Sequence, residues 1–139
     1  MRHLARREGR LGAGDARVDM WLEFGSTSLQ PPFISVFWQR VRLLSKARDA
    51  KVEAVSLTAI GSALAIMEAV MVDNRPYMTG SEFSIADIAL GCLFYRLLDL
   101  YPDTLAKTPL VAAWHGRIAA RPAYQKWVAT SYDELKVVS

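Results

Sequence analysis

The chain has 139 residues, of which 52% are hydrophobic and 22% charged, and this composition excludes a disordered, collagen-like or low-complexity protein. A single cysteine and two histidines can form neither an intramolecular disulfide nor a Cys/His zinc site, so we expect a cytoplasmic domain without a metal. The formal net charge of +3 arises within residues 1–10, and the rest of the chain is neutral. One interpretation of this charge is a basic arm that binds nucleic acid or a membrane surface. Because the rest of the chain is neutral, we expect a solvated helix end instead, and neither nucleic acid nor a membrane as a partner.

Apolar residues recur at helical spacing along almost the whole chain, and no segment alternates as a strand would. The predicted fold class is therefore all-α, a helical bundle. Residues 1–9 are predicted to form a short basic helix, followed by a linker over 10–14 and a second helix capped by Asp15. Pro31 and Pro32 each remove an amide donor from this second helix, so we expect a kink or break there.

The segment 47–73 has the pattern of one long helix, with an apolar stripe that includes Val52, Val55 and Ile60. Glu68 is the one charged residue between positions 54 and 72, which raises the question of a membrane span. Alanine, serine, threonine and glycine dilute the apolarity of this stretch, so we expect a buried core helix instead.

Ser84 and Asp87 have the spacing of a capping box at the start of the next helix, which predicts a structural rather than a catalytic role for Asp87. Every residue in 88–95 is apolar, glycine or aromatic, and this indicates a helix at the centre of the bundle. Cys92 lies in that stretch and is predicted to be a buried core residue, because apolar surroundings disfavour the thiolate that a nucleophile requires.

Two helices that begin with proline are predicted near the C-terminal end. Thr108 precedes Pro109 and is expected to cap a helix ending at Arg121, and Pro122 begins the last helix. His115 has no acidic or cysteine partner four residues away in sequence, so we expect it on the helix surface.

Four segments resemble, in order and spacing, the C-terminal helical domain of glutathione transferases. They are residues 16–24, 37–42, 76–89 and 121–124, and the third, PYMTGSEFSIADIA, resembles the entry into that domain's central helix. Residues 1–9, MRHLARREG, resemble the last helix of the family's N-terminal thioredoxin-like domain. The resemblance thus implies a remnant of that domain with its linker over 1–14 and a C-terminal-type helical domain over 15–139.

In this family the thioredoxin-like domain supplies the catalytic residue and most contacts to glutathione. The resemblance therefore implies glutathione as a co-substrate and no catalytic residue in this chain. It also implies a half-pocket for a small hydrophobic electrophile along the second helix. For the aromatic residues of this half-pocket the alternative is core packing, and for its arginine the alternative is a position on the surface. The residues of this predicted half-pocket are Thr27, Gln30, Phe33, Phe37, Trp38 and Arg42.

The resemblance identifies the chain with the C-terminal domain of an enzyme that conjugates glutathione to hydrophobic electrophiles or reduces glutathione adducts, and implies that the chain alone is inactive. A non-catalytic protein-interaction module of the same fold is the alternative, and a basic-armed nucleic-acid binder is a weaker one. Five large aromatics lie within residues 21–38, more than one core of this size is expected to bury. We therefore expect an exposed apolar patch along residues 16–41 and a homodimer formed through it.

Overall fold

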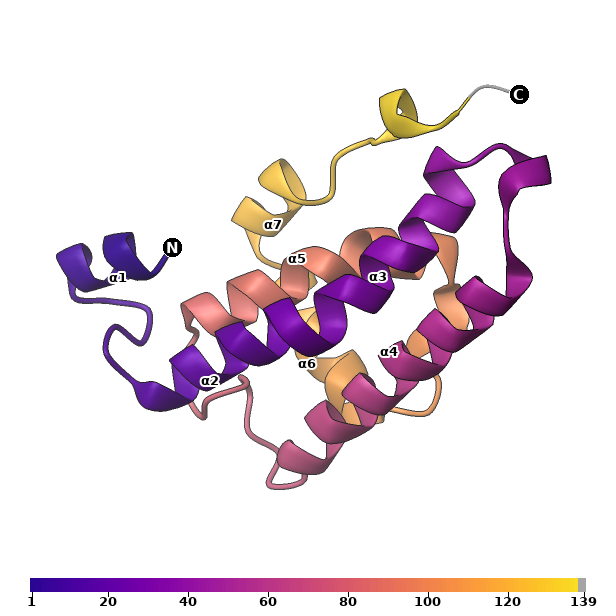
Figure 1. Ribbon diagram of the computed structural model, residues 1–139. Helices are drawn as coiled ribbons and strands as arrows, with labels where there is room; N and C mark the ends of the chain where they lie inside the picture. The colour runs from indigo at the N-terminus through magenta and orange to yellow at the C-terminus, as the bar shows by residue number, and fades with distance from the viewer. Residues whose placement is uncertain (138–139) are drawn as a thin grey trace.

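The computed structural model describes residues 1–137, in which helices are joined by loops and turns and no β-strand occurs (Figure 1). The predicted all-α class is thereby confirmed. The α-helices are α1 (Arg2–Glu8), α2 (Ala16–Phe24), α3 (Gln30–Phe37), α4 (Ala50–Val70), α5 (Ile85–Leu100), α6 (Pro109–Ala119) and α7 (Pro122–Trp127).

The helix predicted to kink or break at the two prolines does not break there. α2 and α3 are joined by a π-helical turn over Gly25–Leu29, and a second π-helical turn, Trp38–Arg42, follows α3. In the first turn the amide of Gln30 donates to the carbonyl of Gly25, five residues earlier. Pro31 and Pro32 have no amide to donate, and the wider turn directly before them lets the chain stay helical.

Helix α5 lies at the centre of the bundle and contacts α2, α3 and α6, while α4 packs against α3 and α6. Two glycines allow this close packing. A Cβ atom on Gly25 would lie 3.0 Å from Leu90, and one on Gly91 would lie 2.8 Å from Cγ2 of Ile118. Glycine at these positions therefore brings α2 and α6 close to the two sides of α5.

The start of α5 is organised around the buried carboxylate of Asp87. The capping box predicted from the sequence is formed, with Oδ2 accepting hydrogen bonds from the amide and the hydroxyl of Ser84, each at 2.9 Å. The other oxygen, Oδ1, accepts from the amide of Met78 at 2.9 Å and from Nε1 of Trp114 at 2.8 Å. Asp87 thus joins the loop before α5, the first turn of α5 and the middle of α6.

The predicted cap of α6 is replaced by a residue from another helix. Thr108 makes no side-chain capping bond, and its hydroxyl donates instead to the carbonyl of Leu105 at 3.4 Å. Glu68 of α4 accepts from the amides of Leu110 and Val111 at 3.0 and 2.9 Å. A carboxylate at a helix N-terminus satisfies free amides and interacts favourably with the helix dipole, so Glu68 has the role predicted for Thr108.

Helix α4 buries part of the predicted stripe, including Ala63 and Met67, and leaves the first residues of that stripe exposed. Ile60 is buried, but Val52 and Val55 are 41% and 70% exposed, as are Ile66 and Val72 at 52% and 70%. By length and composition α4 is apolar enough to cross a membrane, and 28% of its most apolar window is buried in the bundle. Its outer side is therefore an uncovered apolar surface in the described chain.

The linker before α2 is fixed against the start of α5. The carbonyl of Leu11 accepts a hydrogen bond from the amide of Ile85 at 3.1 Å, which satisfies a donor left free at the helix N-terminus. Leu11 has a φ of 59°, in the left-handed region. At Gly12 φ is 76°, and a Cβ atom there would lie 2.6 Å from Val18, so this position requires glycine.

Candidate functional site

An apolar hollow of about 240 Å³ lies between α5 and α7, and we call it the α5–α7 hollow. Its lining includes Phe83, Ile88, Cys92, Ile118 and Trp127. Trp127 is 72% exposed, which is unusual for so large an apolar side chain. The hollow therefore offers aromatic and aliphatic surface to a small apolar molecule or to another polypeptide.

The predicted burial of Cys92 is wrong, because its thiol is exposed on the side of α5 that faces this hollow. The other sides of α5 are covered by α2, α3 and α6. Desolvation by the surrounding apolar groups raises the pKa of the Cys92 thiol above its usual value, so the thiol stays protonated near neutral pH. Cys92 is thus accessible but is not activated as a nucleophile.

A second hollow, of about 420 Å³, continues along α5 toward α2, and we call it the α2–α5 hollow. It shares Ile88 and Cys92 with the α5–α7 hollow and adds more polar groups, among them Gln30 and Glu23. The two hollows together form an open strip along α5.

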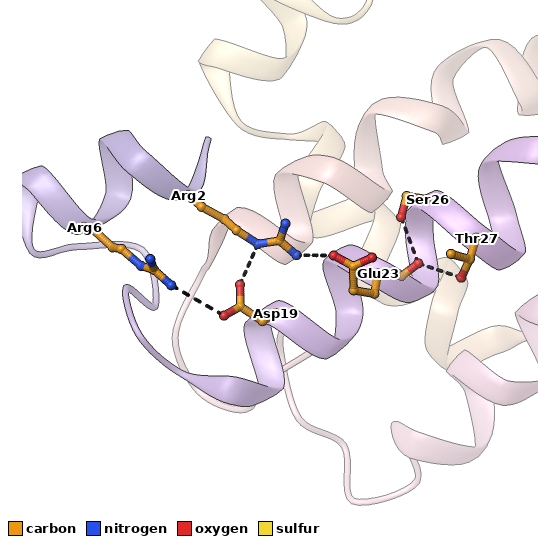
Figure 2. A network of polar contacts seen from close by, with 6 residues as sticks. All are labelled: Arg2, Arg6, Asp19, Glu23, Ser26 and Thr27. Carbon is orange, nitrogen blue, oxygen red and sulfur yellow. Dashed lines mark hydrogen bonds and ion pairs between the residues drawn. The ribbon is translucent and has the colours of Figure 1, made fainter.

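Helix α1 forms one border of the α2–α5 hollow and is held to α2 by ion pairs (Figure 2). Arg2 donates to Asp19 at 2.7 Å and to Glu23 at 2.6 Å, and Arg6 lies 3.9 Å from Asp19. The two arginines and the two carboxylates are each spaced four residues apart on their helices. Two arginines of the N-terminal basic cluster are therefore neutralised within the chain.

The other end of the strip has a cationic border. The guanidinium of Arg121 lies 3.7 Å from the ring centroid of Phe83, and Lys126 lies 4.8 Å from the ring of Trp127. Both arrangements place a positive charge on an aromatic face, where the ring quadrupole stabilises it.

The residues of the predicted half-pocket do not converge on one cavity. Gln30 lines the α2–α5 hollow, whereas the hydroxyl of Thr27 donates to the carbonyl of Glu23 on its own helix at 2.7 Å (Figure 2). Phe33 is buried in the core at 8% exposure. Trp38 is exposed and carries the guanidinium of Arg42 5.6 Å from its ring centroid.

Phe37, the remaining member, is half-buried against a residue that the sequence did not single out. Its ring centroid lies 5.7 Å from that of Tyr132, which belongs to the segment after α7. The hydroxyl of Tyr132 donates a hydrogen bond to Asp99 of α5. No local pattern around residue 132 indicates this contact, because it joins positions almost a hundred residues apart.

The predicted surface position of His115 is wrong, because this residue is half-buried among aromatic rings. Its imidazole stacks on Phe94 with ring centroids 5.3 Å apart, and Nε2 lies 3.2 Å from the hydroxyl of Tyr124. Desolvation lowers the pKa of His115 below its usual value, so the neutral imidazole is favoured in the folded chain. The position is structural.

The tyrosines near the strip are not poised to ionise. Burial raises the pKa of Tyr124 to about 12 and raises the pKa of Tyr132 as well, the latter also through its bond to Asp99. Within residues 1–137 no group of three His, Cys, Asp or Glu side chains is arranged to hold a metal ion. The described strip can therefore bind and orient an apolar molecule, while the thiol of Cys92 and the hydroxyl of Tyr124 stay protonated.

Comparison with known proteins gives a consistent set of relatives. Residues 18–122 match the family model of the glutathione S-transferase C-terminal domain. Glutathione S-transferase 3 of Zea mays is 35% identical over 121 residues, which is 84% of this chain and 54% of the maize protein. Glutathione S-transferase 4 of the same plant is 30% identical over 114 residues, 80% of this chain and 51% of that protein. The chain thus spans about half the length of these curated relatives.

Solved structures agree with these sequence relatives. The apo theta class glutathione S-transferase of the citrus canker pathogen Xanthomonas axonopodis pv. citri superimposes with a TM-score of 0.82 at 30% identity. The alignment covers 94% of this chain and 70% of that chain. The glutathione-bound structure of the same protein gives a TM-score of 0.78 at 29% identity, with the same coverage.

Proposed function

Because the chain belongs to the family of glutathione S-transferase C-terminal domains, we propose that it forms the helical domain of an enzyme that conjugates glutathione to small hydrophobic electrophiles or reduces glutathione adducts. The observation that carries this proposal is the open apolar strip along α5, with its two hollows and the exposed ring of Trp127. Glutathione is the proposed co-substrate, which the glutathione-bound relative supports.

In this proposal the α5 strip provides an apolar wall against which an electrophile is held. Holding the two reactants together lowers the entropic cost of their encounter, so the contribution of this domain is proximity rather than activation. Gln30 adds a polar group at the border of the strip. The hydroxyl of Tyr124 already donates to the carbonyl of Gly91, and the thiol of Cys92 stays protonated, so we assign the activation of the glutathione thiol to groups outside the strip.

The test begins with sequencing the gene upstream of Met1 and assaying its full product with glutathione and a halonitrobenzene. Trp127→Ala is expected to raise the KM for the halonitrobenzene several-fold and to leave the KM for glutathione unchanged. Val72→Ala is the matched control, because Val72 is also an apolar side chain that is 70% exposed. A full product without conjugating or adduct-reducing activity would favour the non-catalytic interaction module.

The 139-residue chain by itself is expected to give no conjugation above the buffer rate. An activating group must donate a hydrogen bond to the glutathione thiolate, and the hydroxyls of Tyr124 and Tyr132 already donate to the carbonyl of Gly91 and to Asp99. Turnover by the purified chain that disappears on mutating one of its residues would contradict this expectation.

We also propose that the protein is a cytoplasmic homodimer. The hydrogen bond between the hydroxyls of Ser35 and Ser56, at 2.8 Å, marks where α3 meets α4, and Ile34 and Val55 beside it are 43% and 70% exposed. This α3–α4 surface is apolar enough to pair with a second copy. The aromatic patch predicted along residues 16–41 contributes less, because Trp21 and Phe33 are buried in the core.

Sedimentation velocity over a concentration series tests the dimer. The double variant Ile34→Lys, Val55→Lys is expected to sediment as a monomer at concentrations where the wild type is dimeric. Leu4→Lys is the control, because this exposed apolar residue lies on α1. A monomeric wild type at high micromolar concentration would refute the proposed dimer.

A further inference from the structure

The segment that follows α7 is anchored to the bundle mainly by the side chain of Tyr132. Tyr132 is 4% exposed, whereas Ser131 and Asp133 on either side of it are exposed. Of the backbone hydrogen bonds formed by residues 131–137, one reaches another part of the bundle, from the amide of Val137 to the carbonyl of Val41 at 3.0 Å. Tyr132 is thus the one buried residue of 131–137, and its ring fills a slot in the bundle like a plug in a socket.

The socket is built by α3 and α5, and we call it the Tyr132 slot. Its walls are the rings of Phe37, 5.7 Å from that of Tyr132, and Tyr95, 6.5 Å away and nearly perpendicular at 88°. The guanidinium of Arg96 lies 5.4 Å from the ring centroid of Tyr132 and 5.6 Å from that of Phe37. At the end of the slot Asp99 accepts the hydrogen bond of the tyrosine hydroxyl.

These groups recognise a particular chemical class. Aromatic walls favour a flat ring, and an edge-on neighbour adds to the area buried. A guanidinium over the ring favours an electron-rich aromatic system. A carboxylate at the far end accepts one hydrogen bond, so a hydroxyl is preferred to a carbonyl at that position. The combination describes a phenol.

We propose that the Tyr132 slot is a binding site for a flat phenolic ring, and that residues 131–137 act as a strap that closes it by inserting Tyr132. An external phenol enters when the strap withdraws. Since Phe37 also belongs to the half-pocket implied by the family resemblance, the slot is the place where an aromatic co-substrate would bind, a role that rests on the proposed function. The binding step itself does not depend on that function.

The first test is chemical complementation of Tyr132→Ala with 4-methylphenol, which carries the phenol ring that this substitution removes. Isothermal titration calorimetry is expected to show binding to this variant that is tighter than to the wild type by about tenfold or more, since buried apolar cavities bind matching rings. Toluene lacks the hydroxyl and is expected to bind the same variant more weakly. Tyr132→Phe keeps the plug and is expected to bind neither compound better than the wild type does.

Tyr101→Ala is the matched control. Tyr101 also donates its hydroxyl to a carboxylate, that of Glu53 at 2.9 Å, and Arg40 lies 5.4 Å from its ring centroid. No aromatic pair involving Tyr101 occurs among the described residues. This variant is therefore expected not to bind 4-methylphenol, because a carboxylate and a cation without aromatic walls do not form the slot.

Three outcomes would overturn the proposal or a part of it. Failure of folded Tyr132→Ala, verified by circular dichroism, to bind 4-methylphenol overturns the binding site. Equal binding of toluene and 4-methylphenol overturns the role of Asp99, which Asp99→Asn in the Tyr132→Ala background tests separately. The strap is tested in the wild type, where millimolar 4-methylphenol is expected to accelerate amide exchange over residues 133–137, and unchanged exchange overturns it.

Failure of the Tyr132 slot as a binding site can be distinguished from failure of the transferase proposal, because none of these measurements uses glutathione or turnover. If the full gene product conjugates glutathione but the Tyr132→Ala variant does not bind 4-methylphenol, the transferase proposal stands and the Tyr132 slot is refuted as a binding site. The converse result would retain the slot in a protein of another function.

Discussion

Replacement of Asp87 tests most directly how the bundle is held together. Its carboxylate is fully buried and accepts four hydrogen bonds, from the amides of Met78 and Ser84, the hydroxyl of Ser84 and the indole of Trp114. Asp87→Ala removes every acceptor at once. The Ser84 hydroxyl can rotate to another partner, but the two amides and the indole N–H remain as buried donors.

A buried donor that loses its acceptor costs about 1–3 kcal/mol, so three of them predict a loss of about 3–6 kcal/mol after partial relaxation or water entry. This exceeds the cost of about 1 kcal/mol for losing a helix cap alone. Asp87→Asn keeps one carbonyl oxygen, which can still face Met78 and Trp114, and its NH2 group then opposes the amide of Ser84. One mismatched pair predicts a smaller loss, about 1–3 kcal/mol.

Urea denaturation followed by tryptophan fluorescence and circular dichroism measures these differences. Asp103→Ala is the control, because Asp103 is an exposed carboxylate and its replacement is expected to change the free energy of unfolding by less than about 0.5 kcal/mol. Ser84→Ala should cost about 1–2 kcal/mol, and the double variant less than the sum, because both residues belong to one network. An Asp87→Ala variant no less stable than Ser84→Ala would refute the four-bond network.

Three further predictions follow from contacts between helices. Glu68→Ala is expected to lower the free energy of unfolding by about 1–2 kcal/mol through loss of the α6 cap, and Glu68→Gln by less, as measured by urea denaturation. Gly91→Ala is expected to destabilise by about 1–3 kcal/mol because its Cβ would meet α6, whereas Gly61→Ala, with open space around it in α4, is expected to stabilise by about 0.5–1 kcal/mol. Burial lowers the pKa of His115 from 6.5, so the unfolded chain takes up a proton first, and stability is expected to fall from pH 7 to pH 5. His115→Gln should flatten this slope, and His3→Gln, at an exposed residue, should not.

Each of these predictions has a result that contradicts it. Equal stability of Glu68→Ala and the wild type would return the cap of α6 to Thr108. Stabilisation by Gly91→Ala would mean that α5 and α6 do not approach as closely as described. A pH slope that survives His115→Gln would assign the acid sensitivity to other groups.

The structural features that could be predicted from the sequence are those in which the interacting groups lie within about four residues of each other along the chain. The caps at Asp15 and Gly9 and the box formed by Ser84 and Asp87 are of this kind, because each side chain or backbone conformation acts on its own helix end. The helical class follows from the same short-range periodicity.

The features that sequence reasoning missed depend on which helices meet. Glu68 caps a helix that begins more than forty residues later. Tyr132 inserts between α3 and α5, whose sequence patterns give no sign of this contact. Cys92 is exposed because it lies on the side of α5 that α2, α3 and α6 leave uncovered. An apolar run in the sequence cannot indicate which side of a helix its neighbours will cover. Of the residues that the family resemblance implied for the half-pocket, Gln30 lines the α2–α5 hollow, whereas Phe33 is buried in the core, the stated alternative for the aromatic residues.

The bond from Leu11 to Ile85 bears on how this unit is to be cut out of a gene. A fragment that starts at Asp15, where the sequence pattern places the domain, or at residue 18, where the family match begins, omits the carbonyl that closes the first turn of α5. It also omits Gly12, whose turn lies against Val18 and Ser84. A fragment that keeps this bond therefore begins no later than Leu11, and a fusion partner is better joined before Gly9 than within the turn that follows it.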